Sequence, residues 1–213
     1  MKRRFLLGGM GAGAAIMGGT ALLGPDLVAP AMAQDNPGRE IPEMTLGAED
    51  APVEFIEYAS FTCPHCARFH EEVYPQLKAD YIDQGTVRFI YREVYFDRFG
   101  LWATMVARCA GPERFFGVTD LIYANQREWT QGDAATVAEN LRRIGRTAGL
   151  SDAELESCLT DGEFAQALVD RYEARLEEHE VPGTPTFIIN GVMHGNMPYS
   201  DMQVLLDGLI AEA

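Results

Sequence analysis

Apolar and polar residues follow two different spacings along this chain, one toward both ends and another through the middle. Toward each end, short runs rich in β-branched and aromatic residues are bounded by Gly, Pro and Asn, a pattern that predicts strands. The strands are expected at residues 44–46, 53–59, 86–92, 186–190 and 192–194. Asn190-Gly191, between the last two strands, predicts a tight hairpin turn.

Helical spacing of apolar residues fills most of the remaining chain. One long helix is expected from Cys63 to about Ile82, and an amphipathic helix over residues 199–211 closes the chain. Between residues 99 and 179 the strand pattern disappears. Helices are predicted there at residues 101–109, 115–123, 134–148, 153–159 and 163–178. The order is a βαβ unit, a helical block and a ββα unit, which indicates an α/β protein.

A pair of closely spaced cysteines follows the buried strand at residues 53–59. The sequence Cys63-Pro64-His65-Cys66 separates this strand from the long helix. Pro64 suits the first helical position, because its missing N–H would have no partner there and its φ is already helical. Cys63 then lies at the helix N-terminus, where free N–H groups and the helix dipole lower the thiol pKa. A protonated or hydrogen-bonding His65 would act in the same direction, so the pattern predicts a redox site.

The same cysteine pair could instead form a structural disulfide or half of a zinc site. Zinc requires a second closely spaced pair of ligands. Cys109 and Cys158 lie far apart in the sequence, and His179 and His194 also lack ligand spacing. Neither a metal nor another cofactor is therefore expected. A junction between a strand and a helix is an unusual place for a structural disulfide, so redox catalysis is the favoured interpretation.

The first 33 residues have the order of a secretory signal peptide. Lys2-Arg3-Arg4 is followed by an apolar, Gly-rich run over residues 5–23 and then by Ala31-Met32-Ala33, with cleavage expected after Ala33. Glycines interrupt the run and make it a poor membrane span. The paired arginines leave the route open between general secretion and twin-arginine export. In a bacterial chain, export leads to the oxidising periplasm, where disulfides persist.

The chain is strongly acidic, with 32 Asp and Glu residues against 17 Lys and Arg and a net charge of −15. Removing residues 1–33 takes away three basic residues and one acidic residue, which leaves a net charge of −17. Such a charge repels phosphate backbones and anionic lipids, so nucleic-acid binding is excluded. About 180 residues remain, enough for one well-packed domain.

A second motif lies beyond the helical block, where Val181-Pro182-Gly183-Thr184-Pro185 leads directly into the strand at residues 186–190. With Cys63-Pro64-His65-Cys66 after Glu57-Tyr58-Ala59-Ser60-Phe61, it makes the mature chain resemble the DsbA family of bacterial thiol–disulfide oxidoreductases. The resemblance implies a thioredoxin-like fold with an inserted helical domain. Its expected parts are a lead-in at residues 34–52, a thioredoxin-like domain at 53–97 and 180–213, and an insertion at 98–179.

The resemblance also implies roles for individual residues. Pro185 matches a cis proline that faces the catalytic disulfide, and with Thr184 it would pair with an extended substrate. Glu57 matches an acidic residue beneath the buried cysteine, which moves a proton as Cys66 attacks. The alternatives are a rigid loop proline for Pro185 and a surface carboxylate for Glu57. Cys63 would form a mixed disulfide with one substrate thiol, and a second substrate thiol would resolve it.

The implied function is a periplasmic dithiol oxidase that acts on reduced or unfolded exported polypeptides and is recycled by a DsbB-like membrane oxidant. A disulfide isomerase or reductase on the same fold is one alternative. Such isomerases dimerise through an N-terminal domain, for which the 19 residues from 34 to 52 leave no room, so a monomer is expected. A non-redox periplasmic binding protein or chaperone is the other alternative.

Cys109 and Cys158 both fall in the predicted helical block. Some relatives of the DsbA type carry a second, non-catalytic disulfide. In an oxidising compartment, two otherwise unpaired thiols on neighbouring helices would form such a bridge. Two buried and inert thiols are the alternative.

Overall fold

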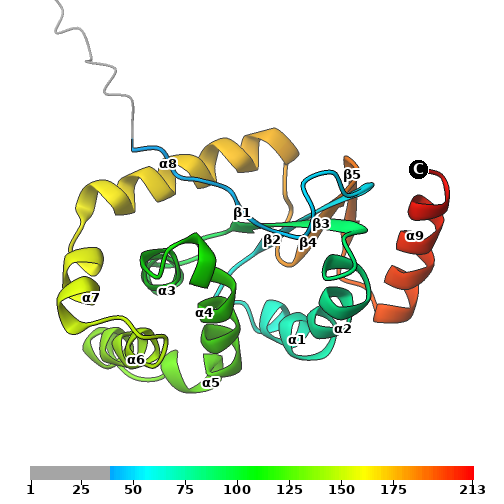
Figure 1. The fold of residues 1–213 in the computed structure, drawn as a ribbon. Coiled ribbons are helices and arrows are strands. Elements are labelled where there is room, and N and C mark those ends of the chain that lie inside the picture. Colours follow the sequence, from blue (N-terminus) through cyan, green and yellow to red (C-terminus); the bar gives the residue numbers. More distant parts are fainter. Residues whose placement is uncertain (1–38) are drawn as a thin grey trace, which may run out of the picture. The chain divides into compact units, whose positions relative to one another are not determined.

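A five-stranded sheet forms the centre of the computed structural model, which describes residues 39–213 (Figure 1). The expected signal peptide and the start of the lead-in lie outside the described residues. The strand order is β1-β3-β2-β4-β5, and β2 and β3 run parallel while the other neighbours run antiparallel. The strands are β1 (Met44–Leu46), β2 (Val53–Ala59), β3 (Val87–Glu93), β4 (Thr186–Ile189) and β5 (Val192–Gly195). The predicted α/β class is confirmed.

Helices surround this sheet, and those from α3 to α8 all lie between β3 and β4 in the sequence. They are α1 (Pro64–Glu72), α2 (Tyr74–Leu77), the π-helical turn η1 (Lys78–Ile82), α3 (Arg98–Cys109), α4 (Pro112–Ala124), α5 (Gln126–Trp129), α6 (Ala134–Thr147), α7 (Asp152–Leu159), α8 (Gly162–His179) and α9 (Tyr199–Ala211). Among the described residues, no helix is both long and apolar enough to span a membrane.

The prediction of one continuous helix from Cys63 to Ile82 is wrong. The segment divides into α1, α2 and η1, and α1 ends just before Val73. Pro75 explains the break, because it has no N–H to donate to the residue four positions earlier and its ring collides with that carbonyl. At the end of η1 the N–H of Asp83 donates to the carbonyl of Lys78 at 2.8 Å, which is the wider spacing of a π-turn.

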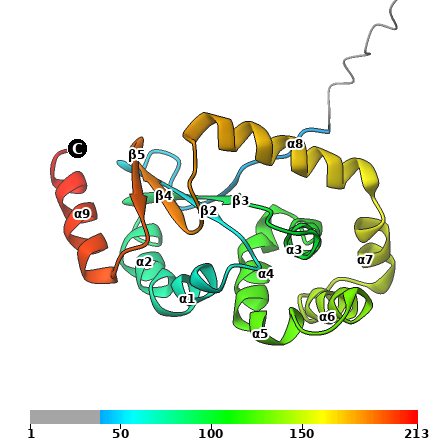
Figure 2. The same cartoon turned by 180° about the vertical axis from the view of Figure 1, so that it is seen from behind.

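Successive side chains of β2 point to opposite faces of the sheet. Phe55 belongs to the main core, which α1, α2, α4 and α9 complete. Ile56 and Tyr58 belong to a separate cluster that also contacts Tyr172 of α8. Figures 1 and 2 accordingly show α8 crossing the sheet on the side opposite α1. Glu57 shares the face of Phe55 and is therefore directed toward α1.

Two turns use backbone conformations that favour glycine. Gly47 follows β1 with a φ of +91°, and a Cβ at this position would lie 2.3 Å from the carbonyl oxygen of Val87. Asn190 and Gly191 join β4 to β5 with φ values of 45° and 81°. Positive φ at both positions is what a type I′ hairpin requires, so the predicted tight turn is confirmed.

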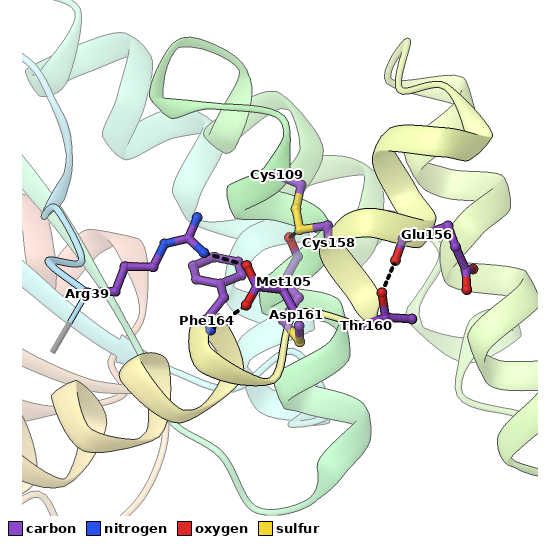
Figure 3. The surroundings of a disulfide bond; sticks show 8 residues. All are labelled: Arg39, Met105, Cys109, Glu156, Cys158, Thr160, Asp161 and Phe164. Atoms are coloured by element: carbon purple, nitrogen blue, oxygen red, sulfur yellow. Dashed lines mark hydrogen bonds and ion pairs between the residues drawn. A yellow bond between two sulfur atoms is a disulfide. The ribbon is translucent and has the colours of Figure 1, made fainter.

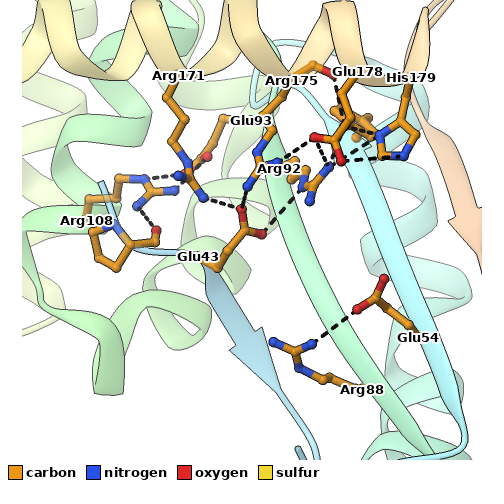
Figure 4. A network of polar contacts seen from close by, with 12 residues as sticks. Glu43, Glu54, Arg88, Arg92, Glu93, Arg108, Arg171, Arg175, Glu178 and His179 are labelled. Atoms are coloured by element: carbon orange, nitrogen blue, oxygen red, sulfur yellow. Dashed lines mark hydrogen bonds and ion pairs between the residues drawn. The ribbon is translucent and has the colours of Figure 1, made fainter. Parts of the chain in front are cut away.

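A network of charged side chains covers the α8 side of the sheet (Figure 4). Glu43 lies just before β1 and pairs with Arg92 of β3 and with Arg175 of α8. Arg108 of α3 donates two hydrogen bonds to Glu93 of β3, at 2.6 and 2.8 Å, and both side chains are buried. The network therefore joins the lead-in, β3, α3 and α8.

Candidate active site

The cysteines of Cys63-Pro64-His65-Cys66 lie at the start of α1 as free thiols. Cys63 immediately precedes the helix and Pro64 occupies its first turn. The main-chain N–H groups of His65 and Cys66 both lower the pKa of the Cys63 thiol, so His65 contributes here through its backbone. Cys63 is 7% exposed and Cys66 is fully buried. Within residues 39–213 no group of three His, Cys, Asp or Glu side chains is arranged to hold a metal ion.

Its surroundings lower the pKa of the Cys63 thiol to about 5. The largest cause is a hydrogen bond from the Cys66 thiol to the Cys63 sulfur. Burial opposes this effect, because it deprives a charged sulfur of solvent, while the Thr184 hydroxyl and the two N–H groups reinforce it. At neutral pH, Cys63 is therefore a thiolate, which is the nucleophilic form.

Cys66 has the opposite character. Burial is the largest cause that raises the pKa of its thiol, followed by the hydrogen bond with Cys63 and the negative charge of Glu57. Cys66 therefore remains protonated at neutral pH. The pair combines one ionised sulfur with one protonated sulfur, and the protonated one must lose its proton before it can attack.

Thr184 and Pro185 reach the site from the other end of the chain. The Cys63 Sγ atom lies 3.4 Å from the main-chain carbonyl oxygen of Thr184, and the Thr184–Pro185 peptide bond is cis. Pro185 is buried, and β4 begins at the next residue. The fold thus brings together the two motifs that the sequence places on either side of the helical block.

Glu57 is fully buried, so the alternative of a surface carboxylate is wrong. Its Oε2 atom lies 2.9 Å from Nε2 of His70, and the two side chains are 0% and 1% exposed. Sequence reasoning missed His70. The available signal was its position four residues after Cys66, which places both side chains on one face of α1.

Gln126 is a second residue that sequence reasoning missed. It belongs to the short helix α5, and its side-chain amide donates to the carbonyl oxygens of Phe61 and Cys63, at 2.8 and 2.9 Å. Gln126 is buried, and it holds the main chain on both sides of Thr62. A residue from the helical region therefore fixes the backbone that leads into the Cys63–Cys66 pair.

Cys109 and Cys158 form a disulfide between the end of α3 and the end of α7 (Figure 3). The two residues are 49 positions apart in sequence, and their Cα atoms are 6.3 Å apart. Cys158 is buried in a small cluster with Met105 and Phe164. The structure therefore pairs the two cysteines whose state the sequence left open.

Sequence comparison relates the chain to known redox proteins. The family model described as thioredoxin matches residues 39–208. A Rickettsia bellii protein provisionally named protein-disulfide oxidoreductase is 31% identical over 172 residues, which cover 80% of this chain and 66% of that protein. Disulfide bond formation protein D of Bacillus subtilis is 26% identical over 154 residues, covering 68% and 66%. The chain thus spans slightly less than two thirds of the length of these relatives.

Solved structures share the fold of the described residues. The crystal structure of Wolbachia pipientis alpha-DsbA1 superposes with a TM-score of 0.76 at 26% identity, covering 82% of this chain and 94% of that one. BdbD from Bacillus subtilis superposes with a TM-score of 0.71 at 20% identity, covering 79% and 93%, and at this identity the likeness concerns the fold alone. The predicted thioredoxin-like fold is confirmed.

Proposed function

The chain belongs to the DsbA family of thioredoxin-like proteins, and from that premise we propose that it is a thiol–disulfide oxidoreductase with Cys63 and Cys66 as its redox pair. The observation that carries the proposal is the opposite pKa shift of the two thiols, which is suited to disulfide exchange. Stabilising the Cys63 thiolate stabilises the reduced protein and so raises the reduction potential of the pair. The rise is roughly 30 mV for each unit by which the pKa falls, a relation already known from DsbA itself. We therefore favour oxidation of substrate dithiols as the direction of the reaction.

The proposed reaction begins with the Cys63–Cys66 disulfide. A substrate thiolate attacks the Sγ atom of Cys63, the disulfide breaks, and Cys66 leaves as a thiolate that takes up a proton. A second substrate thiolate then attacks the substrate sulfur that is bound to Cys63. The mixed disulfide breaks, and Cys63 departs as a thiolate. The substrate gains a disulfide, and the protein holds one thiolate and one thiol.

Substrates and partners follow from the same proposal. The substrates are reduced exported polypeptides, and a DsbB-like membrane oxidant restores the Cys63–Cys66 disulfide in the periplasm. Thr184 and Pro185 are assigned to substrate positioning, because the Thr184 carbonyl lies beside the Cys63 sulfur. The protein works as a monomer after cleavage at Ala33. Residues 53–97 and 180–213 form its thioredoxin-like domain, and residues 98–179 form the insertion.

The proposed direction is tested by equilibrating the protein with mixtures of reduced and oxidised glutathione. Alkylation followed by mass spectrometry measures the fraction of protein that holds the Cys63–Cys66 disulfide. An oxidase should have a potential above about −200 mV, whereas a value near −270 mV would indicate a reductase. Cys66→Ser should trap mixed disulfides at Cys63, and Cys63→Ser should be inert. A wild-type protein that exchanges no disulfide with glutathione would overturn the proposed function.

A further inference from the structure

A cleft of about 780 Å³ lies beside the buried end of the redox site, and its walls include residues of α1, α2, α4 and α5. His70, Tyr74 and Asp120 contribute to these walls. His70 and Tyr74 are more than nine-tenths buried. Among the described residues, neither Nδ1 of His70 nor the hydroxyl of Tyr74 has a hydrogen-bond partner. Two residues of the cleft wall therefore carry buried polar atoms that the described part of the fold does not satisfy.

The two ring nitrogens of His70 have different surroundings. Nε2 lies 2.9 Å from Oε2 of the buried Glu57, whereas Nδ1 is buried without a hydrogen-bond partner among the described residues, and His70 also contributes to the cleft wall. The ring stacks on Tyr123 with its centroid 4.3 Å away and lies 4.6 Å from the ring of Tyr74. Imidazole can accept a proton at one nitrogen while it releases one from the other. His70 is therefore held in place to connect a buried carboxyl group with the cleft.

Several titratable groups face His70 from the neighbouring elements. They are Cys66 on α1, Glu57 on β2, Tyr91 on β3, Tyr74 on α2, and Asp120 and Tyr123 on α4. Burial raises the pKa of all three tyrosines, so they remain protonated at neutral pH. Burial also raises the pKa of Asp120, while the charge of His70 lowers it. Asp120 lines the cleft together with His70 and is the carboxyl group of this set that does so.

We propose that His70 relays the proton that Cys66 gains and loses in each redox cycle between the Glu57 carboxyl group and solvent in the cleft. The inference rests on the proposed thiol–disulfide exchange. When the disulfide opens, the Cys66 thiolate takes a proton through Glu57. His70 replaces that proton from Nε2 and accepts one from solvent at Nδ1. The reverse transfer deprotonates Cys66 when Cys66 attacks Cys63. One proton therefore moves each time the disulfide opens or closes, and no other reactant is needed.

The role is tested by stopped-flow reaction of the reduced protein with oxidised glutathione, which separates two steps. In the first step Cys63 attacks oxidised glutathione and releases one glutathione thiolate, and in the second Cys66 attacks the resulting mixed disulfide and releases the other. His70→Gln keeps an N–H for Glu57 but cannot relay protons. The rate of the first step should stay within about twofold of the wild type, and the rate of the second step should fall at least about 10-fold. This threshold is smaller than the usual contribution of general acid–base catalysis to a rate.

The equilibrium constant separates a relay from a structural role. A relay slows the second step equally in both directions, so the equilibrium constant of His70→Gln with glutathione should match that of the wild type. The relay would be overturned if the equilibrium constant changed by the same factor as the rate of the second step. It would also be overturned if the rate of the second step did not change. If the wild-type protein lacks the first step, the proposed function fails instead. Tyr74→Phe is the matched control, and it should leave both steps unchanged.

Two further measurements do not depend on the folding of His70→Gln. In the wild-type protein, heavy water should slow the second step about twofold or more and leave the first step nearly unchanged, because only the second moves a proton through the relay. Imidazole added to His70→Ala should restore the second step in proportion to its concentration. A second step that is insensitive to heavy water would overturn the proposal.

Discussion

The Sγ atom of Cys63 lies 3.4 Å from the main-chain carbonyl oxygen of Thr184, a residue 121 positions later in the sequence. The buried hydroxyl of the same threonine has no hydrogen-bond partner within residues 39–213, so it is available to the Cys63 thiolate, and the Thr184 side chain lowers the pKa of the thiol. The charge on Cys63 therefore depends on a side chain from the C-terminal part of the chain, in addition to the helix start that carries the cysteine.

Thr184→Val should raise the pKa of Cys63 above its value of about 5, because it removes a hydroxyl that is available to the thiolate and lowers this pKa, while it preserves side-chain shape. One hydrogen bond to a charged group stabilises it by about 1.5–3 kcal/mol, so a rise of about one to two pKa units is expected. Thiolate absorbance measured against pH gives the value directly. Thr119→Val is the matched control, since that hydroxyl is also buried but lies in α4. Equal curves for the wild type and Thr184→Val would contradict this role.

The stability of the reduced protein should depend on pH through Cys63. Its pKa is about 5 in the folded protein and about 9 when unperturbed, so the native state binds fewer protons between these values. The contribution of the thiolate to the free energy of unfolding should be complete above about pH 9 and disappear as the pH falls to about 5. Urea unfolding of reduced wild type and Cys63→Ser measures it. The oxidised protein, which has no thiolate, should show no such difference between pH 5 and 9.

Replacing both Cys109 and Cys158 with serine should lower the free energy of unfolding by about 2–4 kcal/mol, because the disulfide closes a loop of 49 residues. Exchange at Cys63 should remain close to the wild-type rate. Denaturant unfolding under oxidising conditions measures the loss. The opposite outcome, equal stability together with two free thiols found by mass spectrometry, would show that the bridge does not form in solution.

Arg108→Met should destabilise the protein by about 3–5 kcal/mol, because Glu93 would be left buried without its partner. Replacing both residues, as Arg108→Met with Glu93→Leu, should recover much of that loss. Arg142→Met is the control, since Arg142 pairs with Glu156 near the surface and its removal should cost at most about 1 kcal/mol. Urea unfolding of the four proteins tests the comparison, and similar losses for Arg108→Met and Arg142→Met would contradict it.

The order of the elements and the position of Cys63 and Cys66 at a helix start could be predicted because their signals are local. The strand spacing before Cys63, the proline after it and the Asn190-Gly191 turn each occupy a few consecutive residues. The break at Pro75 was also open to prediction, because a proline inside a helical pattern ends or kinks the helix. It was obscured by apolar residues that continue at helical spacing on both sides.

The contacts of His70 and Gln126 could not be predicted in the same way. His70 pairs with a strand residue 13 positions earlier, and Gln126 donates to main-chain oxygens 63 and 65 positions earlier. Such contacts depend on how α1 and α5 pack, and side-chain chemistry alone does not select the partners. Helix α5 has four residues, which is too short for hydrophobic spacing to identify it.

The contact between Cys63 and Thr184 has a consequence for the order in which the protein is made. Synthesis begins at the N-terminus, so the cysteine leaves the ribosome while Thr184 and the strand β4 that follows it are still untranslated. Until they arrive, the Cys63 sulfur lacks the Thr184 side chain, which lowers the pKa of its thiol in the complete chain. A nascent or truncated chain therefore carries less reactive sulfur than the mature protein, and full activation of the thiol follows completion of the polypeptide.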